Sequence, residues 1–141
     1  KTCEMTAFLN PSENSYARFG SYKAPIYVSW SRENRSQLVR IPAAEGEYRR
    51  AELRSPDPEA NPYLAFALMI YAGLYGLENR LDLPEPADIN LYTADEKMLT
   101  NFCRLPKDLA AARAAAFSSD FIRKHIPAAV LEVYCGKKSD R

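Results

Sequence analysis

Residues 49–62 read RRAELRSPDPEANP, and the rest of the chain can be interpreted around this stretch. Its first half alternates like a β-strand, so Arg50, Glu52 and Arg54 are expected to project from one face. The three side chains would form a row roughly 13 Å long, at about 3.3 Å per residue. Such a row suits a metal held by Glu52, with anionic ligands bound by the arginines on either side. It also suits a solvated strand edge of alternating charge, and the spacing alone leaves both interpretations open.

The second half of the stretch ends the strand and begins a helix. Pro56 and Pro58 interrupt strand pairing, and Asn61 followed by Pro62 predicts a helix N-cap with proline at the first helical position. The apolar residues that follow lie nearly all round the predicted helix, which predicts burial on several sides; they are Leu64, Phe66, Ala67, Met69, Ile70, Leu74 and Leu77. Gly73 and Gly76 would permit a backbone or a ligand to approach this helix closely.

The remaining patterns predict an α+β fold, with a partial antiparallel sheet followed by helices. Short polar turns separate three candidate strands and therefore suggest an antiparallel meander; the strands are expected at residues 26–30, 37–41 and 47–54. Residues 1–25 read as loops around short extended pieces. Two further helices are expected after the long one, at residues 105–117 and 120–134, with Ser118 as the cap and Pro127 as a kink in the second.

The length of 141 residues fits a single domain. Because the sequence begins at Lys1 without an initiator methionine, we interpret it as a domain fragment. It divides into a strand and loop region that carries the arginine-rich site, a helical region and a polar tail, at residues 1–60, 61–135 and 136–141.

Composition excludes several classes of partner. The net charge is only +1, so nothing in the overall charge attracts nucleic acid or an anionic membrane. The longest apolar run, from Leu64 to Leu77, is too short to span a bilayer. Cys3, Cys103 and Cys135 are far apart in the sequence and odd in number, which favours a reduced, cytoplasmic chain.

The candidate chemistry rests on oxygen ligands and arginines. His125 is the one histidine, so a multi-histidine metal site is excluded, and we interpret His125 as structural. A metal would therefore be bound by oxygen, which favours Mg²⁺ or Mn²⁺. The five glycines have no phosphate-loop spacing.

Five candidate arginines all fall within the first 54 residues, in or beside the predicted strands and their turns: Arg18, Arg35, Arg40, Arg50 and Arg54. If they converge with Glu52, they form a site for a polyanion such as a nucleoside triphosphate. If they do not converge, they are surface charge.

Several ordered motifs resemble the C-terminal catalytic region of the glutamine synthetase family. The resemblance spans roughly residues 6 to 125, and its motifs are NSYAR at 14–18, AP at 24–25, NRS at 34–36, RIP at 40–42, RAELRSPD at 50–57, ANPYL at 60–64, AGLYGLEN at 72–79 and NLY at 90–92.

The resemblance implies a ligase that joins ammonia to the side-chain carboxylate of glutamate through a γ-glutamyl phosphate, using ATP and divalent metal ions. It implies that Glu52 is a metal ligand and that Arg18 and Arg54 bind glutamate. It also implies that Arg35, Arg40 and Arg50 bind the phosphates of ATP, with Arg35 and Arg40 stabilising the transferring phosphoryl group. Self-association of the intact protein is a further expectation.

Two features depart from the family pattern. Lys23 stands before Ala24-Pro25, where the family usually has a glutamate on a loop that closes the site and helps to deprotonate ammonium. A lysine there would repel the cation, so an organic amine is an alternative substrate. The motifs that supply most metal ligands in the family are absent from this chain, so we expect the chain to be inactive alone.

Tyr92 matches a tyrosine that is adenylylated in some bacterial members, although the residues that follow it differ. A non-catalytic relative kept for assembly or regulation is the third alternative.

Overall fold

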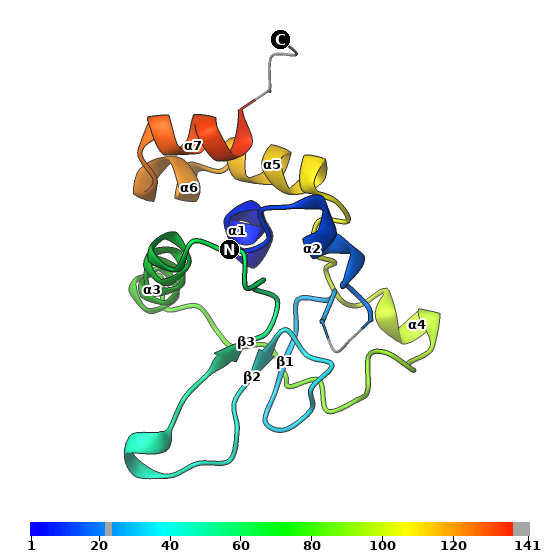
Figure 1. Cartoon of the computed structure of the whole chain (residues 1–141). Helices are drawn as coiled ribbons and strands as arrows, with labels where there is room; N and C mark the ends of the chain where they lie inside the picture. The colour runs from blue at the N-terminus through cyan, green and yellow to red at the C-terminus, as the bar shows by residue number, and fades with distance from the viewer. Residues whose placement is uncertain (22–23, 137–141) are drawn as a thin grey trace. The chain divides into compact units, whose positions relative to one another are not determined.

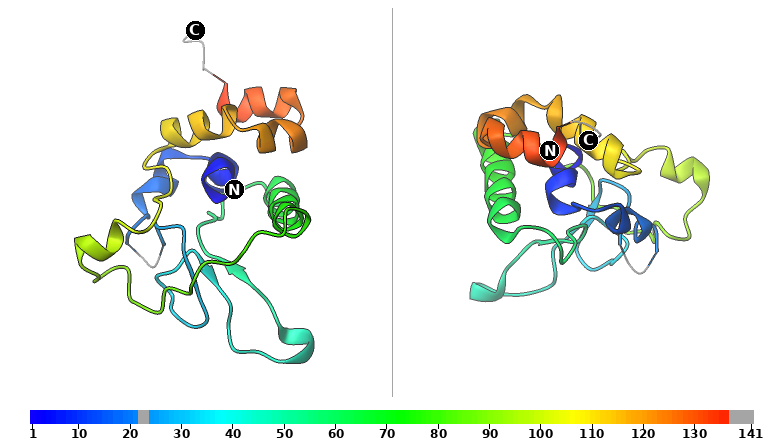
Figure 2. Two further views of the ribbon diagram at one scale, coloured as in Figure 1. Left: turned by 180° about the vertical axis from the view of Figure 1, so that it is seen from behind. Right: turned by 45° about the horizontal axis from the view of Figure 1, so that its top comes forward.

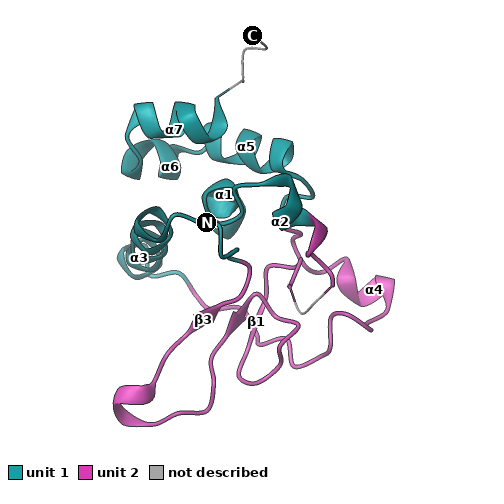
Figure 3. Ribbon diagram, viewed as in Figure 1, with its two compact units in different colours: residues 1–16, 56–81, 106–141 teal, residues 17–55, 82–105 magenta. Residues whose placement is uncertain are grey.

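The computed structural model describes residues 1–21 and 24–136, which form two compact units (Figure 3). Unit 1 comprises Lys1–Tyr16, Pro56–Leu81 and the chain from Pro106 onward, and unit 2 comprises Ala17–Ser55 and Asp82–Leu105. The predictions for Lys23 and for the tail at residues 137–141 fall outside the described residues.

Unit 1 is helical and is organised around its first helix (Figure 1). The helices of this unit are α1 (Thr2–Leu9), α3 (Pro62–Glu78), α5 (Leu109–Phe117), α6 (Asp120–His125) and α7 (Ala128–Cys135), while α2 (Glu13–Ala17) extends into the first residue of unit 2. The helix α1 packs against α3, α5, α6 and α7, and the two further views agree on this arrangement (Figure 2). The core of the unit therefore surrounds α1.

The prediction of loops across residues 1–25 is wrong for α1 and α2. Met5, Ala7, Phe8 and Leu9 of α1 are all fully buried, at 2% exposure or less. A helix that is apolar nearly all round is expected where it is covered by neighbours on every side. Its sequence lacks the polar face that identifies an amphipathic surface helix, and the sequence analysis missed it for that reason.

The start of α3 is confirmed. The side chain of Asn61 accepts hydrogen bonds from the backbone nitrogens of Tyr63 and Leu64, at 3.0 and 3.4 Å, and Pro62 takes the first helical position. The predicted burial on several sides is not found within the described part of the chain, where only Ala65 and Leu68 of this helix are buried.

The C-terminal region was expected to form two helices, and the structure has three there, α5, α6 and α7. Asp108 caps α5 by accepting a hydrogen bond from the backbone nitrogen of Ala111 at 2.7 Å, so this helix begins later than predicted. The last predicted helix is divided into α6 and α7 at Pro127, which has no N–H to continue the backbone ladder and instead caps α7.

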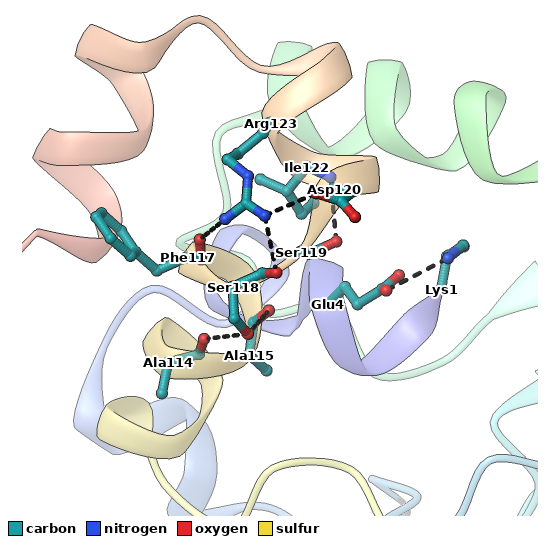
Figure 4. Close-up of polar contacts among 10 residues, drawn as sticks. All are labelled: Lys1, Glu4, Ala114, Ala115, Phe117, Ser118, Ser119, Asp120, Ile122 and Arg123. Atoms are coloured by element: carbon teal, nitrogen blue, oxygen red, sulfur yellow. Dashed lines mark hydrogen bonds and ion pairs between the residues drawn. The ribbon is translucent and has the colours of Figure 1, made fainter.

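The junction between α5 and α6 is held by polar contacts (Figure 4). Ser119, rather than Ser118, caps α6 by accepting a hydrogen bond from the backbone nitrogen of Ile122 at 3.2 Å. The guanidinium of Arg123 donates to the carbonyl oxygen of Phe117 at 2.7 Å and pairs with Asp120 at 2.7 Å. The side chain of Ser118 donates back to the carbonyl oxygen of Ala114, which suits a residue that ends a helix.

Unit 2 contains a small sheet of three short strands in the order β1 (Trp30–Ser31), β2 (Val39–Arg40) and β3 (Glu52–Leu53). The strands β2 and β3 are antiparallel, as the predicted meander requires, with Arg40 opposite Glu52. The strands β1 and β2 pair in parallel, which corrects the meander for that pair.

All three predicted strands are shorter than expected, and β2 retains only Val39–Arg40 of residues 37–41. Gly46 has a φ of +57°, in the left-handed region that favours glycine, and a 3₁₀ turn at Gly46–Tyr48 replaces the first part of the strand expected at residues 47–54. The strand expected at residues 26–30 instead makes an isolated bridge, in which Tyr27 pairs with Arg104. A short helix, α4 (Glu96–Leu99), lies nearby in the sequence.

The small sheet and the helices together confirm the α+β class. No helix in residues 1–21 or 24–136 has the length and apolar character needed to cross a bilayer.

Candidate functional site

The centre of the candidate site is the pair formed by Arg40 and Glu52 in unit 2. These residues face each other across the antiparallel strands β2 and β3, where side chains of opposite charge attract. The Arg40 guanidinium NH1 lies 2.9 Å from Oε2 of Glu52, and both side chains are less than a third exposed. Nε of Arg40 also donates to the carbonyl oxygen of Glu33 at 3.1 Å. The guanidinium is therefore held at two points.

Arg50 contacts the other oxygen of the same carboxylate. Its NH2 and Nε lie 3.2 and 3.3 Å from Oε1 of Glu52, so the carboxylate is shared by two arginines. The hydrogen bond from Arg40, opposed by partial desolvation and assisted by the positive charges of Arg40 and Arg50, lowers the pKa of the Glu52 carboxyl below its ordinary value. We call Arg40, Arg50 and Glu52 the Glu52 cluster.

Arg54 is the residue directly after β3, two positions beyond Glu52. Its backbone nitrogen donates to the carbonyl oxygen of Leu38 at 2.9 Å, which fixes the chain where β3 ends. Its guanidinium NH1 is buried and makes no hydrogen bond within the described residues. Since a buried guanidinium nitrogen is costly to leave without an acceptor, this position suits a ligand oxygen.

Arg18 approaches the same stretch of backbone. Its NH2 donates to the carbonyl oxygen of Ser55 at 3.2 Å, so the Arg18 guanidinium lies against the backbone of the residue that follows Arg54. The structure therefore associates Arg18 with the residue after Arg54, although 37 positions separate it from Ser55 in the sequence.

The turn that carries Arg35 is anchored by amides and hydroxyls. The side-chain nitrogens of Asn34 and Gln37 both donate to the carbonyl oxygen of Ile89 at 2.8 Å. The hydroxyl of Ser36 accepts a hydrogen bond from the backbone nitrogen of Leu91 at 2.9 Å. These contacts fix the turn, and Arg35 lies exposed on it. Among the described residues, Arg40 and Arg50 contact Glu52 and Arg35 does not.

Tyr92 follows the segment that anchors this turn. Its backbone nitrogen donates to Oδ1 of Asn90 at 3.0 Å, and its side chain is 38% exposed. Burial of the rest of the side chain raises the pKa of the Tyr92 hydroxyl, against the lowering influence of Arg54. The ring lines a pocket of about 190 Å³ together with Tyr27 and Leu99.

The described residues do not bring together a cluster of candidate metal ligands. Among residues 1–21 and 24–136, no three side chains of the types His, Cys, Asp or Glu lie close enough together to share an ion. Glu52 offers a single carboxylate, and both of its oxygens already contact arginine.

One open hollow of unit 2 was not predicted. It is an open groove of about 980 Å³, lined by Trp30, Arg32, Glu33, Asn34, Ile41, Pro42, Ala43, Ala44 and Asp88. None of the predicted site arginines lines it, although Arg32 and Asp88 lend it charge. A turn rich in polar residues was the only signal in the sequence, and a hollow formed with residues some 50 positions later could not be inferred from it.

Comparison with known proteins places these residues in a family. Residues 1–140 match the family described as "Glutamine synthetase, catalytic domain". The glutamine synthetase of Methanosarcina mazei is 44% identical over 141 residues, which cover 97% of this chain and 32% of that protein. The glutamine synthetase of Methanocaldococcus jannaschii is 38% identical over 133 residues, which cover 92% of this chain and 29% of that protein.

A solved structure agrees with the sequence comparison. The structure described as "GmaS/ADP complex-Conformation 1" superposes with a TM-score of 0.77 at 34% sequence identity, and the match covers 91% of this chain and 30% of that one. The chain thus spans about a third of the length of the relatives it matches. Because the match extends over essentially the whole sequence, the chain belongs to the glutamine synthetase family, within its catalytic domain.

Proposed function

We propose that this chain is part of an ATP-dependent ligase that joins ammonia to the side-chain carboxylate of glutamate through a γ-glutamyl phosphate. The observation that carries the proposal is the Glu52 cluster, in which Arg40 and Arg50 are held by one carboxylate on paired strands. Phosphoryl transfer to a carboxylate concentrates negative charge, and guanidiniums already fixed in place stabilise that charge without reorganising.

The arginines divide between the two anionic substrates. Arg35, Arg40 and Arg50 are assigned to the phosphates of ATP, with Arg35 and Arg40 stabilising the phosphoryl group during transfer. Arg18 and Arg54 are assigned to glutamate. Support for Arg54 comes from its buried NH1, which a substrate carboxylate would supply with an acceptor.

Glu52 is assigned as one ligand of Mg²⁺ or Mn²⁺. A single carboxylate is too few protein ligands for either ion, and residues 1–21 and 24–136 hold no cluster of three candidate ligands, so further ligands are proposed to come from residues outside this chain. The chain alone is therefore proposed to be inactive. The assembled protein is proposed to be cytoplasmic and to self-associate.

A second candidate is a ligase that takes an organic amine in place of ammonia. Lys23 favours it, because a positive charge at the ammonium-loop position would repel the ammonium ion. The third candidate, a non-catalytic relative, gives no reason for two arginines to be held on one carboxylate near a third whose buried NH1 has no acceptor among the described residues.

Tyr92 is proposed as a possible modification site. Its partly exposed ring leaves the hydroxyl available for the adenylylation that the family resemblance implies.

A chimera tests the activity. Residues 1–141 would replace the matched stretch of the Methanosarcina mazei glutamine synthetase, and ADP release would be followed with glutamate, Mg²⁺ and ATP. The amines are ammonium and a panel of small organic amines, the variants are the chimera and its Lys23→Glu form, and the unaltered mazei enzyme is the positive control.

The outcomes separate the three candidates. Activity with ammonium supports the leading proposal. Activity only with an organic amine, shifting toward ammonium in the Lys23→Glu form, supports the second. A folded chimera that releases no ADP with any amine contradicts both enzymatic proposals. Turnover by the 141-residue chain alone contradicts the proposed dependence on residues outside it.

A further inference from the structure

One side of α3 carries a continuous stripe of exposed apolar side chains. Tyr63, Phe66, Ile70, Leu74 and Leu77 follow one another at intervals of three or four residues, which places them on a single face of the helix. Their exposed fractions run from 44% for Leu74 to 84% for Tyr63. We call these five residues the α3 stripe.

The α3 stripe is too large to be incidental. A large aromatic side chain presents roughly 150–250 Å², so these fractions amount to on the order of 500 Å² of exposed apolar surface. Contiguous apolar patches of that size on a protein surface usually mark an interaction site.

The helix has no polar side that could face water instead. From Pro62 to Leu77 it contains no charged residue, and Glu78 is its last residue. Its opposite side already packs on α1 through the buried Ala65 and Leu68. A helix that is apolar all round is characteristic of the interior of a larger domain, whereas a surface helix keeps a polar face.

Gly73 adds an independent observation. It is exposed near Phe66 and Leu77 on the helix surface, and a Cβ added there would meet nothing within 4 Å in the described structure. Glycine inside a helix costs roughly 0.5–1 kcal/mol relative to alanine. No contact in these two units calls for a glycine at this position, whereas another polypeptide packed closely on the helix would.

We propose that the α3 stripe is the docking face for the part of a longer parent polypeptide that lies outside these 141 residues. This inference rests on the proposed function, because it requires the chain to work as part of a larger ligase. The relatives supply the length: about two thirds of each lies outside the matched stretch. A second copy of this chain could instead cover the α3 stripe by packing its own α3 against it. The test below distinguishes this alternative from the proposal.

The test measures the accessibility of one position on the stripe. Ile70→Cys reports on the stripe, and Val133→Cys on α7 is the matched control, since Val133 is an 80% exposed apolar residue off the stripe. Cys3 and Cys103 are replaced by serine in both. Maleimide labelling is then followed in the 141-residue chain and in the chimera with the mazei enzyme.

In the chain alone, we expect both introduced thiols to react at similar rates. In the chimera, we expect the Ile70→Cys thiol to react on the order of tenfold or more slowly, because burial removes it from solvent, and the Val133→Cys thiol to be unaffected. Equal labelling of Ile70→Cys in the chain and in the chimera would overturn the proposal. Protection in the chain alone, with light scattering reporting a dimer, would assign the stripe to a second copy and also overturn it.

A two-chain version covers the case in which the chimera does not fold. The mazei enzyme without its matched stretch is expressed as a separate chain and mixed with the tagged 141-residue chain. We expect capture by the wild-type chain and by Val133→Asp, and loss of capture with Phe66→Asp. No capture by the wild type, or equal capture by Phe66→Asp, contradicts the proposal.

The two proposals fail in different ways. A chimera that protects Ile70→Cys but releases no ADP contradicts the proposed activity and leaves the docking face standing. A chimera that is active with Ile70→Cys fully accessible contradicts the docking face alone.

Discussion

Arg40 and Glu52 are register partners on antiparallel strands, and the guanidinium of one lies 2.9 Å from the carboxylate of the other. The strand pairing and the ion pair therefore place the same two residues together. Arg50 reaches the second carboxylate oxygen from the loop before β3, so one acidic residue orients two basic ones.

The Glu52 cluster makes a prediction about pH. The Glu52 carboxyl has a pKa below its ordinary value of 4.5 in the folded chain. Its ionised form therefore stabilises the fold above the unfolded-state pKa, and that contribution is lost as the pH falls through the lower folded-state pKa. We expect the stability difference between wild type and Glu52→Gln to shrink toward zero in acid, measured by urea unfolding between about pH 2 and 7.

Glu47→Gln is the control, because Glu47 lies in the exposed 3₁₀ turn before β3 and has no arginine contact among the described residues. If Glu52→Gln and Glu47→Gln change stability identically at every pH, the two arginines do not stabilise the ionised carboxylate.

Arg40→Lys tests the geometry of the cluster. A lysine keeps the charge but cannot donate to Glu52 and to the Glu33 carbonyl oxygen from one planar group. In the active chimera we expect a loss of kcat on the order of 10²-fold, the cost of removing one oriented donor in a polar active site. Arg49→Lys, at an exposed neighbour, is the control. Retained kcat in Arg40→Lys would show that charge alone suffices.

Gly73→Ala should stabilise the 141-residue chain. The added methyl group meets open space, and alanine is favoured over glycine in a helix by roughly 0.5–1 kcal/mol. Chemical unfolding of the wild type and the variant measures the difference. A destabilised variant would mean that another part of the chain packs against this side of α3.

The thiol of Cys135 should resist alkylation. Burial raises the pKa of Cys135 to about 11, from an ordinary value of 9.0. Near pH 8 the thiolate fraction is then roughly 100-fold lower than at the ordinary pKa. Mass spectrometry after iodoacetamide treatment should find the exposed Cys103 modified first, with Cys135 modified only in denaturant. Equal modification in the native chain would contradict the buried position of Cys135.

Local chemistry made part of this fold predictable. The Asn61-Pro62 cap of α3 and the interruption at Pro127 both depend on a few adjacent residues, and the structure has both. The pairing of β2 with β3 follows from alternation and a connecting turn, and it is also present.

Features that depend on distant partners were not predictable. The parallel pairing of β1 with β2 has no local signature, because strand direction is decided by the path of the intervening chain. The helix α1 has no clear polar face in its sequence because most of it is buried against α3, α5, α6 and α7, which come much later in the chain. Gly46 offered a visible signal for the turn that shortens β3, but a glycine between charged residues fits a loop equally well.

The candidate site was foreseen in its composition and only partly in its arrangement. Arg50 and Glu52 were expected to be neighbours from alternation alone. The contact between Arg40 and Glu52 depends on strand register, which the sequence leaves open. The groove beside Trp30 depends on the later segment around Asp88, and no spacing rule connects the two.

The carbonyl oxygen of Ile89, which accepts hydrogen bonds from Asn34 and Gln37, has a consequence for sequence divergence. The Asn34 and Gln37 side chains contact the backbone of residue 89, so we expect the side chain of residue 89 to be free to change among homologues. The two amides have no such freedom, because loss of either removes a donor from this carbonyl oxygen and weakens the anchor of the turn. We therefore expect relatives to vary at position 89 while retaining amide side chains at 34 and 37, a pattern in which the more variable position is nonetheless the anchor.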